Sequence, residues 1–431
     1  MSNKIVNDEF SNELNKDIIC FKNRDKKSAI LQKKVLNLSH LKTYTIDDKE
    51  TLEIDDAISL EIRDGKYKLW IHIASPAANL EYNSPIDKSA RKLISSLYLT
   101  TTNIYMLPKI LIEDLYSLTT KEKRPSLSLG VVFNNDASIY STEMVQSLIK
   151  PNYKLSYEEA DELIDYAPKE EEDLSIISKI LEKRKFWRKK RGATEILESQ
   201  GKIVVNDNIP RIKIIDPTLS RQLISEAMIL YGDVISNYTY YNNIPVPYRV
   251  QESKSILIDN NNSINNIIYT NFLLKQNMSK TYYSLSKLRH NSLGLNSYVH
   301  ATSPIRRYCD LLVHYQLNRF INNKDLISKE DIEIHISEIN NLSKQNIMKY
   351  REDQKIWKHR WFKNNQFLTY KVIFLKWINR YKNICIIYFI DFSFSYICHL
   401  TSKLDIRSGE EIIINNITND YNDILYFKLN L

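Results

Sequence analysis

The stretch T-I-D-D-K-E-T-L-E-I-D-D, from Thr45 to Asp56, places six carboxylates within ten residues. Its flanks favour strands, because K-T-Y-T-I leads in and A-I-S-L-E-I follows. The turn Asp64-Gly65 then starts a return strand, Y-K-L-W-I-H-I-A. A D-G pair between alternating apolar runs is a strong hairpin signal. The acids are therefore expected on a strand edge or loop that a sheet holds in place.

This acidic run needs positive charge nearby. Closely packed carboxylates repel one another, and the repulsion raises some of their pKa values. Ligands that are all oxygen suit a hard cation such as magnesium or manganese. An exposed acidic turn is the alternative for an arbitrary chain. A calcium EF-hand is excluded because the sixth position from Asp47 is not Gly and the twelfth is Ile58 instead of Glu.

A second signal is Y-V-H-A-T-S-P-I-R-R-Y-C-D-L-L-V-H-Y-Q-L, from Tyr298 to Leu317. Ser303 followed by Pro304 predicts a helix start, which puts Arg306 and Arg307 in the first turn. The helix dipole is already positive there, so two cations beside free N–H groups indicate a site for an anion such as phosphate. Two surface arginines paired with acids are the alternative. An acid cluster together with an arginine turn indicates phosphodiester chemistry.

Composition sets wider bounds. The chain has 431 residues, a net charge of +8 and a pI near 8.9, which fits a polyanionic partner and equally fits plain solubility. Its four cysteines form no C-x-x-C pair, which argues against a zinc site or disulfide framework.

The longest apolar run, Ile384 to Ile390, is too short to span a membrane. We expect a monomer in the cytoplasm or a plastid-like compartment, with no membrane contact.

The acidic run resembles the catalytic signature of the ribonuclease II/R (RNB) family of exoribonucleases, and T-S-P-I-R-R-Y-x-D resembles that family's second signature. Further matches follow in chain order: M-L-P at Met106–Pro108, L-Y-S-L at Leu115–Leu118, R-P-S-L-S at Arg124–Ser128, L-S-Y-E-E at Leu155–Glu159, R-G-A at Arg191–Ala193, S-E-A-M at Ser225–Met228 and H-N-S-L-G-L at His290–Leu295. The resemblance covers roughly residues 41 to 360. It implies an α+β fold, in which a mixed sheet and its surrounding helices form a channel for a single RNA strand.

The domain organisation follows from the same resemblance. We expect a polar extension at residues 1–40, an RNB catalytic domain at 41–365 and a small OB-type RNA-binding β-barrel at 366–431, where five short runs alternate like strands. From the resemblance we expect a short form of the family, without the cold-shock-type barrels that typically precede the catalytic domain in bacteria. In the tail, the aromatic residues Tyr381, Phe394 and Tyr396 either stack on bases or belong to the core.

The family resemblance implies magnesium-dependent 3′-to-5′ hydrolysis of single-stranded RNA to nucleoside 5′-monophosphates, with manganese as a possible substitute. Carried over by position, the metal ligands are Asp47, Glu53, Asp55 and Asp56. Asp47 and Asp56 are the firmest ligands, and loss of Asp55 is expected to be the most damaging. Glu53 stands where the family more commonly has Asp. Because Asp56 would point away from Glu53 and Asp55 in an extended strand, the chain must be irregular near Asp55.

Other roles are implied in the same way. Arg306 matches the arginine that contacts the scissile phosphate, and Arg307 is expected to contact RNA in its support. Tyr98 falls where an aromatic ring stacks on the last bases. Tyr157 falls where a tyrosine helps to distinguish ribose from deoxyribose. Both tyrosines could instead be core aromatics.

Glu226 is also expected to contact RNA, but it stands alone because Ser225 occupies a position where the family often has a second acid. Two functions from different classes therefore remain: an active exoribonuclease, or an RNA-binding protein whose nuclease activity is reduced or lost. The acid set favours the first, because all four positions carry carboxylates and Arg306 is present. A DNA exonuclease is a distant third, since the context of Tyr157 favours RNA.

Overall fold

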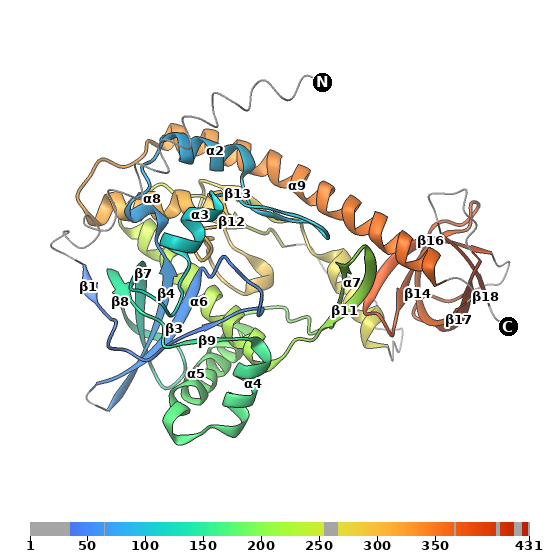
Figure 1. Ribbon diagram of the computed structural model, residues 1–431, viewed down its shortest axis with the longest axis horizontal. Coiled ribbons are helices and arrows are strands. Elements are labelled where there is room, and N and C mark those ends of the chain that lie inside the picture. Colours follow the sequence, from blue (N-terminus) through green and yellow to red (C-terminus); the bar gives the residue numbers. More distant parts are fainter. Residues whose placement is uncertain are drawn as a thin grey trace.

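The computed structural model describes residues 35–63, 65–253, 266–365, 368–401, 406–417 and 425–429. A mixed sheet with helices on both faces forms the larger part, and a closed barrel lies at the far end of a long helix (Figure 1). The α+β fold class predicted from the sequence is confirmed. Most of the expected N-terminal extension, residues 1–34, lies outside the described residues.

The main sheet has seven strands in the order β1-β8-β7-β4-β3-β2-β9. Their bounds are β1 Leu36–Asn37, β2 Thr43–Ile46, β3 Asp56–Arg63, β4 Lys66–Ala74, β7 Arg124–Phe133, β8 Ile139–Ile149 and β9 Tyr153–Leu155. The edge strands β1 and β9 pair in parallel and the others pair antiparallel. The predicted hairpin is β3–β4, with Arg63 opposite Lys66 and Gly65 at a φ of 73°. Glycine suits this turn because it adopts positive φ without steric cost.

Both faces of this sheet are buried. Along β3 and β4, Ile58 and Ile71 enter one core, while Ala57 and Trp70 enter the other, as the two-residue strand period requires. Helices cover the two faces: α5 and α6 contribute to the first core, and α2 and the start of α9 to the second. The helices are α2 Pro85–Leu93, α3 Lys109–Leu111, α4 Tyr157–Tyr166, α5 Glu172–Lys189, α6 Leu219–Tyr241, α7 Ile267–Asn277, α8 Tyr308–Ile321 and α9 Lys329–Asn364.

Within the described residues, four short helical turns and three two-stranded sheets complete the larger part. The turns are η1 Pro76–Ala78, η2 Ile112–Tyr116, η3 Lys169–Glu171 and η4 Asn291–Leu293. The small sheets pair β5 Leu97–Tyr98 with β6 Asn103–Ile104, β10 Gln200–Asn206 with β11 Ile209–Ile215, and β12 Tyr248–Val250 with β13 Tyr282–Ser284. None of the helices in the described residues is long and apolar enough to cross a membrane.

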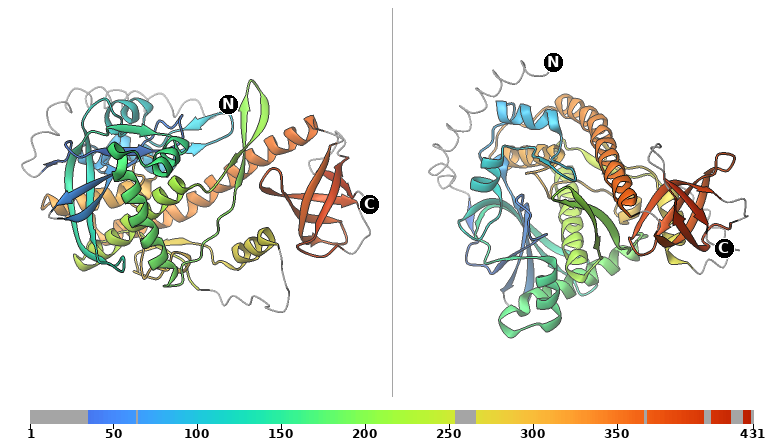
Figure 2. Two further views of the ribbon diagram at one scale, coloured as in Figure 1. Left: turned by 90° about the horizontal axis from the view of Figure 1, so that it is seen from below. Right: turned by 45° about the vertical axis from the view of Figure 1, so that its right-hand side comes forward.

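Helix α9 links the sheet to the barrel. Its 36 residues extend for about 54 Å at 1.5 Å per residue. Ile332 and Ile339 near its start lie in the sheet core, whereas Phe362 near its end lies in the barrel core. The β10–β11 hairpin contacts α9 and reaches the barrel (Figure 2). A Cβ on Gly201 would lie 1.8 Å from the Phe392 carbonyl oxygen, so only glycine fits where the hairpin meets the barrel.

The barrel has the strand order β14-β15-β16-β18-β17 and closes by pairing β17 with β14. Its strands are β14 Thr369–Asn379, β15 Ile384–Phe389, β16 Phe394–Thr401, β17 Glu411–Asn416 and β18 Tyr426–Leu429. This five-stranded closure confirms the predicted barrel. Phe394 and Tyr396 are buried in its core, whereas Tyr381 is fully exposed. Of these three candidates for base stacking, only Tyr381 presents its ring to solvent.

Replacing Phe362 by Ala should destabilise the barrel by about 3–5 kcal/mol, because it leaves a cavity among packed rings. Phe362 is fully buried and contacts the rings of Tyr370, Phe389, Phe394, Tyr396 and Phe427. Urea unfolding followed by tryptophan fluorescence would measure the loss. The matched control is Tyr381→Ala, which removes an exposed ring and should change stability by less than about 0.5 kcal/mol. Equal effects of the two changes would contradict this assignment of the barrel core.

Candidate active site

The acidic run forms the loop between β2 and β3. The Asp47 N–H donates to the Leu155 carbonyl at 3.0 Å, which ties the start of the loop to β9. Farther along, the Ser117 hydroxyl donates to the Leu52 carbonyl at 2.6 Å and accepts from the Ile54 N–H at 3.0 Å. The acids therefore lie on an irregular loop whose backbone is held by hydrogen bonds. The sequence predicted such an irregularity near Asp55, because a regular strand would point Asp56 away from Glu53 and Asp55.

Asp47 and Asp56 form one half of the acid group. Both are half-buried, and burial raises the pKa of each. The pKa of Asp56 rises to about 7, because the charge of Asp47 adds to the effect of burial. The Asp47 carboxylate accepts from the Asp48 N–H at 2.7 Å and from the Thr51 hydroxyl at 3.0 Å, and these bonds oppose the rise of its own pKa. A cation between the two carboxylates would relieve their repulsion.

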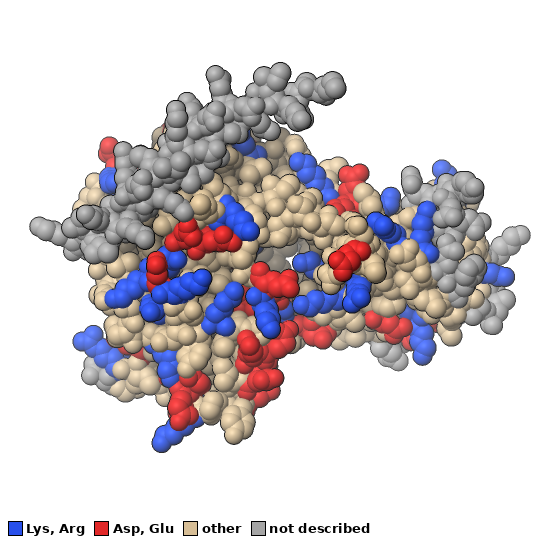
Figure 3. Space-filling view, viewed as in Figure 1, with Lys and Arg blue, Asp and Glu red and all other residues tan. Residues whose placement is uncertain are grey.

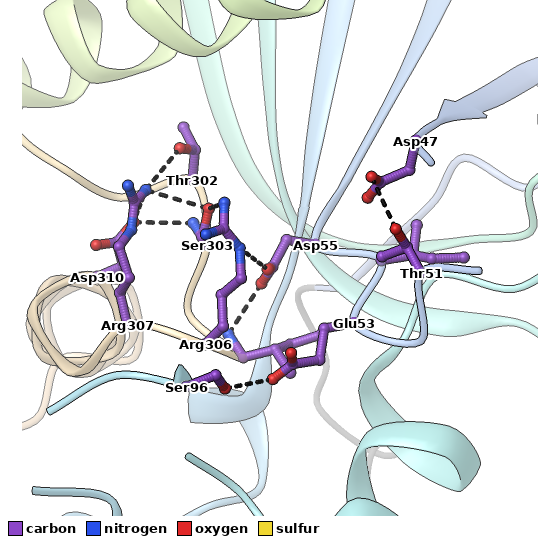
Figure 4. Close-up of polar contacts among 12 residues, drawn as sticks. Asp47, Thr51, Glu53, Asp55, Ser96, Thr302, Ser303, Arg306, Arg307 and Asp310 are labelled. Carbon is purple, nitrogen blue, oxygen red and sulfur yellow. Dashed lines mark hydrogen bonds and ion pairs between the residues drawn. The ribbon is translucent and has the colours of Figure 1, made fainter. Parts of the chain in front are cut away.

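Asp55 joins the acid loop to the second signature. Its Oδ1 accepts from the Ile305 N–H at 2.9 Å, and its Oδ2 lies 3.3 Å from Nε of Arg306. Figure 4 shows Asp55 and Arg306 pointing toward each other, with Asp47 on the far side of the loop. Burial raises the pKa of Asp55 well above its usual value, and the Arg306 charge opposes the rise. The structure thus brings together residues that are 250 positions apart in sequence.

The arginine turn differs from its sequence prediction in one respect. Helix α8 begins at Tyr308, so Ser303 does not cap it and residues 303–307 form a separate turn. The reason is the buried carboxylate of Asp310, which accepts from the Ser303 N–H at 2.8 Å and from Arg307 at 2.6 Å. The Ser303 hydroxyl accepts from both Arg306 and Arg307. The two arginines still lie at the amino end of the helix, but just before its first turn.

Arg306 and Arg307 differ in how much of their hydrogen-bonding capacity the protein uses. Arg307 donates to Thr302, Ser303 and Asp310, and its side chain is 27% exposed. Arg306 contacts Asp55 and Ser303 and is 40% exposed. Arg306 is therefore the more available of the two for a bound phosphate, whereas Arg307 holds the turn.

Glu53 is held by two hydroxyl groups at and just before β5. Its carboxylate accepts from the Ser96 hydroxyl at 2.7 Å and from the Tyr98 hydroxyl. It is buried, and burial raises its pKa while the two hydroxyl donors oppose the rise. The structure thus places two predicted site residues, Glu53 and Tyr98, in direct contact.

The remaining candidates lie on α4 and α6. The half-buried Tyr157 ring stacks under the Arg221 guanidinium at 3.8 Å, and burial together with the charges of Asp47 and Asp56 raises the pKa of its hydroxyl. Glu226 is buried and accepts from Arg188 at both carboxylate oxygens. Glu226 therefore has its charge compensated inside the protein.

The sequence did not single out several supporting residues. Ser117 and Asp310 lie inside quoted motifs, and Arg188 lies in the basic run at residues 182–191, which reads as a solvated helix face with RNA contact as the alternative. In the structure, basic side chains of that run pair with acids: Arg184 with Asp233, Arg188 with Glu226, and Lys185 and Lys189 with Glu195. A polar residue inside a matched motif was the signal available for Ser117 and Asp310. Ser96 lies outside the quoted motifs and carried no comparable signal.

The acid group fits a hard divalent cation in its chemistry. Within the described residues, no three His, Cys, Asp or Glu side chains are arranged to hold a metal ion by themselves. Magnesium does not need such a cage, because it keeps several waters and is commonly bound by one or two carboxylates and substrate phosphates. Asp47 and Asp56, two mutually repelling carboxylates with raised pKa values, match that requirement.

A cavity of about 410 Å³ lies beside Ser96 and Tyr98, the partners of Glu53, and is lined by side chains of β5, β10 and α9. Its lining includes Tyr98, Lys202, Arg307 and Tyr350. On the face drawn in Figure 3, charged side chains of both signs surround a hollow, and no continuous basic surface is present. Aromatic rings next to cations suit the bases and phosphates of a single strand.

Comparison with known proteins places these features in a family. The model of the RNB domain matches residues 35–323. An uncharacterized ribonuclease of Synechocystis sp. is 33% identical over 346 residues, covering 79% of this chain and 52% of that protein. A chloroplastic/mitochondrial ribonuclease II of Arabidopsis thaliana is 34% identical over 298 residues, covering 67% of this chain and 37% of that protein. The chain thus spans about half, or less, of the length of these relatives.

Solved structures share the fold. Mycoplasma genitalium RNase R, in complex with ribose-methylated single-stranded RNA, superposes with a TM-score of 0.85 at 19% identity. The match covers 96% of this chain and 74% of that one. It therefore extends beyond the RNB domain to include the barrel.

Proposed function

The chain belongs to the RNB-domain family, and from this premise we propose that it is a 3′-to-5′ exoribonuclease acting on single-stranded RNA. We further propose that it requires magnesium and releases nucleoside 5′-monophosphates. The observation that carries the proposal is the junction of the two signatures, where Asp55 contacts both Ile305 and Arg306 beside the Asp47–Asp56 pair. The acid pair proposed to bind a cation therefore lies close enough to Arg306, the arginine proposed to meet the phosphate, for its charge to act on both acids.

Asp47 and Asp56 are the carboxylates proposed to hold the magnesium ion, which manganese could replace. When bound, the ion would supply Lewis acidity and a water nucleophile at neutral pH. Arg306, which is partly exposed, would neutralise charge on the scissile phosphate. Asp55 orients that arginine and keeps the 303–307 turn against the acid loop.

The proposed RNA contacts follow the positions of the remaining candidates. Tyr98 lines the cavity next to the site and would stack on a terminal base. Tyr157 lies near Asp47 and Asp56, where its hydroxyl would meet the terminal ribose. Glu226 would have to share its carboxylate with Arg188 to contact RNA. Arg307 would act mainly by holding the turn.

The alternative is an RNA-binding protein with reduced or lost nuclease activity. The retained acids and the Asp55–Arg306 contact favour the enzyme, because a protein that only binds RNA would not need to keep them together. For the location we propose the cytoplasm or a plastid-like compartment. The relative named as chloroplastic/mitochondrial supports the second of these.

A time course on 5′-labelled single-stranded RNA tests the proposed function. With magnesium, the RNA should shorten from its 3′ end, and chromatography should identify nucleoside 5′-monophosphates. EDTA should stop the reaction, and added magnesium or manganese should restore it. A DNA strand of the same sequence should remain intact. Tight RNA binding with no shortening in either metal would instead support the RNA-binding alternative.

A further inference from the structure

We propose that Glu53 is a positioning residue: its carboxylate fixes the Tyr98 ring and the arginine turn relative to the acid loop, and it does not bind the catalytic cation. The inference rests on the proposed function, because Tyr98 is expected to meet the end of an RNA strand. It assigns to Glu53 a different task from that of Asp47 and Asp56.

The hydrogen bonds around Glu53 assign a donor to each of its oxygens. The Ser96 hydroxyl accepts from the Met106 N–H at 3.0 Å, so its own hydrogen is left to donate to Oε1 of Glu53 at 2.7 Å. The Tyr98 hydroxyl donates to Oε2. A buried carboxylate with a hydroxyl donor on both oxygens is satisfied by the protein itself. A cation bound at Glu53 would therefore have to compete with these two donors.

Backbone hydrogen bonds connect the segment that carries Ser96 to the segment of the second signature. The Ser96 N–H donates to the Arg306 carbonyl at 2.9 Å, and the Tyr308 N–H donates to the Ile94 carbonyl at 2.8 Å. The neighbouring Ile305 N–H donates to Asp55 on the acid loop. Glu53 thus fastens one side of the acid loop to the segment that carries Arg306, and Asp55 fastens the other side.

The length of the glutamate side chain matters in this arrangement. Aspartate is one methylene shorter, which is about 1.5 Å along the side chain. An aspartate at position 53 would fall short of Ser96, of Tyr98 or of both, leaving a partly buried hydroxyl without its acceptor. The Glu that departs from the more common Asp is therefore matched to its partners in this chain.

Helix α9 holds the β5–β6 hairpin from the opposite side. Asp353 accepts from the Thr100 N–H at 2.9 Å and from its hydroxyl at 2.5 Å. Asn346 donates to the Leu93 carbonyl at 3.1 Å and to the Ser95 hydroxyl at 3.2 Å. Because these anchors do not involve Glu53, its replacement should free the Tyr98 ring while the hairpin stays attached. The expected effect is confined to the Tyr98 ring and to the contact between the acid loop and the 303–307 turn, which Asp55 still holds through the Ile305 N–H.

Cation binding gives the first test. Manganese titrations of the full chain, followed by electron paramagnetic resonance without RNA, should give Glu53→Gln and Glu53→Asp affinities within about twofold of the original protein. Asp56→Asn should weaken binding by roughly tenfold or more. A loss in Glu53→Gln as large as that in Asp56→Asn would make Glu53 a metal ligand and overturn the proposal.

The second test couples Glu53 to Tyr98. Glu53→Asp and Tyr98→Phe should each raise KM by roughly tenfold with a smaller change in kcat, and the double variant should resemble either single one. Additive losses would contradict a shared role. If Glu53→Asp does not fold, Ser96→Ala replaces it in the same KM and kcat measurements, because it removes the other hydroxyl that donates to Glu53.

A binding measurement separates this inference from the proposed function. RNA with 2-aminopurine near its 3′ end, in EDTA, should change fluorescence on binding the original chain and change less with Glu53→Asp or Tyr98→Phe. This result does not depend on hydrolysis. If the original chain failed to shorten RNA, the proposed function would fall while the manganese and fluorescence results still decided the role of Glu53. Equal fluorescence changes in all variants would overturn the positioning role.

Discussion

Replacing Asp55 by Asn should lower kcat by on the order of 10³-fold or more. The Asp55 carboxylate accepts from the Ile305 N–H with one oxygen and pairs with Arg306 through the other. An amide has only one oxygen, so one of these donors would face an NH₂ group. Arg306 would then lose the contact that aims it at the phosphate. Single-turnover rates on 5′-labelled RNA with saturating magnesium would measure the loss.

The same substitution should leave the fold intact. Burial raises the pKa of Asp55 in the folded protein, so ionising it at neutral pH, above its unfolded pKa, costs folding free energy. Neutral Asn avoids that cost, and the thermal midpoint in magnesium-free buffer should stay the same or rise. RNA binding in gel-shift assays should also persist. A rate within tenfold of the original, or a collapsed thermal midpoint, would contradict the role assigned to Asp55.

The features that sequence could predict here depend on local rules. Alternating apolar residues and a D-G turn specify β3–β4, and five alternating runs specify the barrel. The contacts of the site are not local. Glu53 meets Ser96 and Tyr98, more than forty residues away, and no pattern within the acid run signals those partners.

The helix start shows how a tertiary contact overrides a local rule. Ser followed by Pro predicts a cap and a first turn, yet Asp310 takes the Ser303 N–H and the Arg307 guanidinium. A buried carboxylate needs strong donors, and these two satisfy it. The segment 303–307 therefore forms its own turn, and α8 begins at Tyr308, four residues later than the Ser303-Pro304 pair predicts. The motif placed the arginines correctly near the helix end but did not reveal their different environments.

Because Arg306 is partly exposed and Arg307 is bound to the buried Asp310, the larger loss of activity is expected at Arg306. Arg306→Lys should lower kcat by roughly 10²-fold with little change in thermal stability. The guanidinium contacts Asp55 through Nε and Ser303 through Nη2, while the side chain remains 40% exposed. A single ammonium cannot make both contacts and also face a phosphate in a bidentate manner. Rates and RNA affinity measured on the same oligomer would separate catalysis from binding.

Two comparisons make the Arg306 result specific. Arg319→Lys is the matched control, because Arg319 lies at the other end of α8 and donates to the Asp325 carbonyl; its rate should be unchanged. Arg307→Lys should instead lower the thermal midpoint, because Arg307 is committed to the buried Asp310. If Arg306→Lys and Arg307→Lys lost equal activity without destabilisation, both arginines would face the substrate. A loss confined to Arg306 would identify it as the residue that meets the phosphate, since the two share one turn and differ mainly in how many protein acceptors they contact.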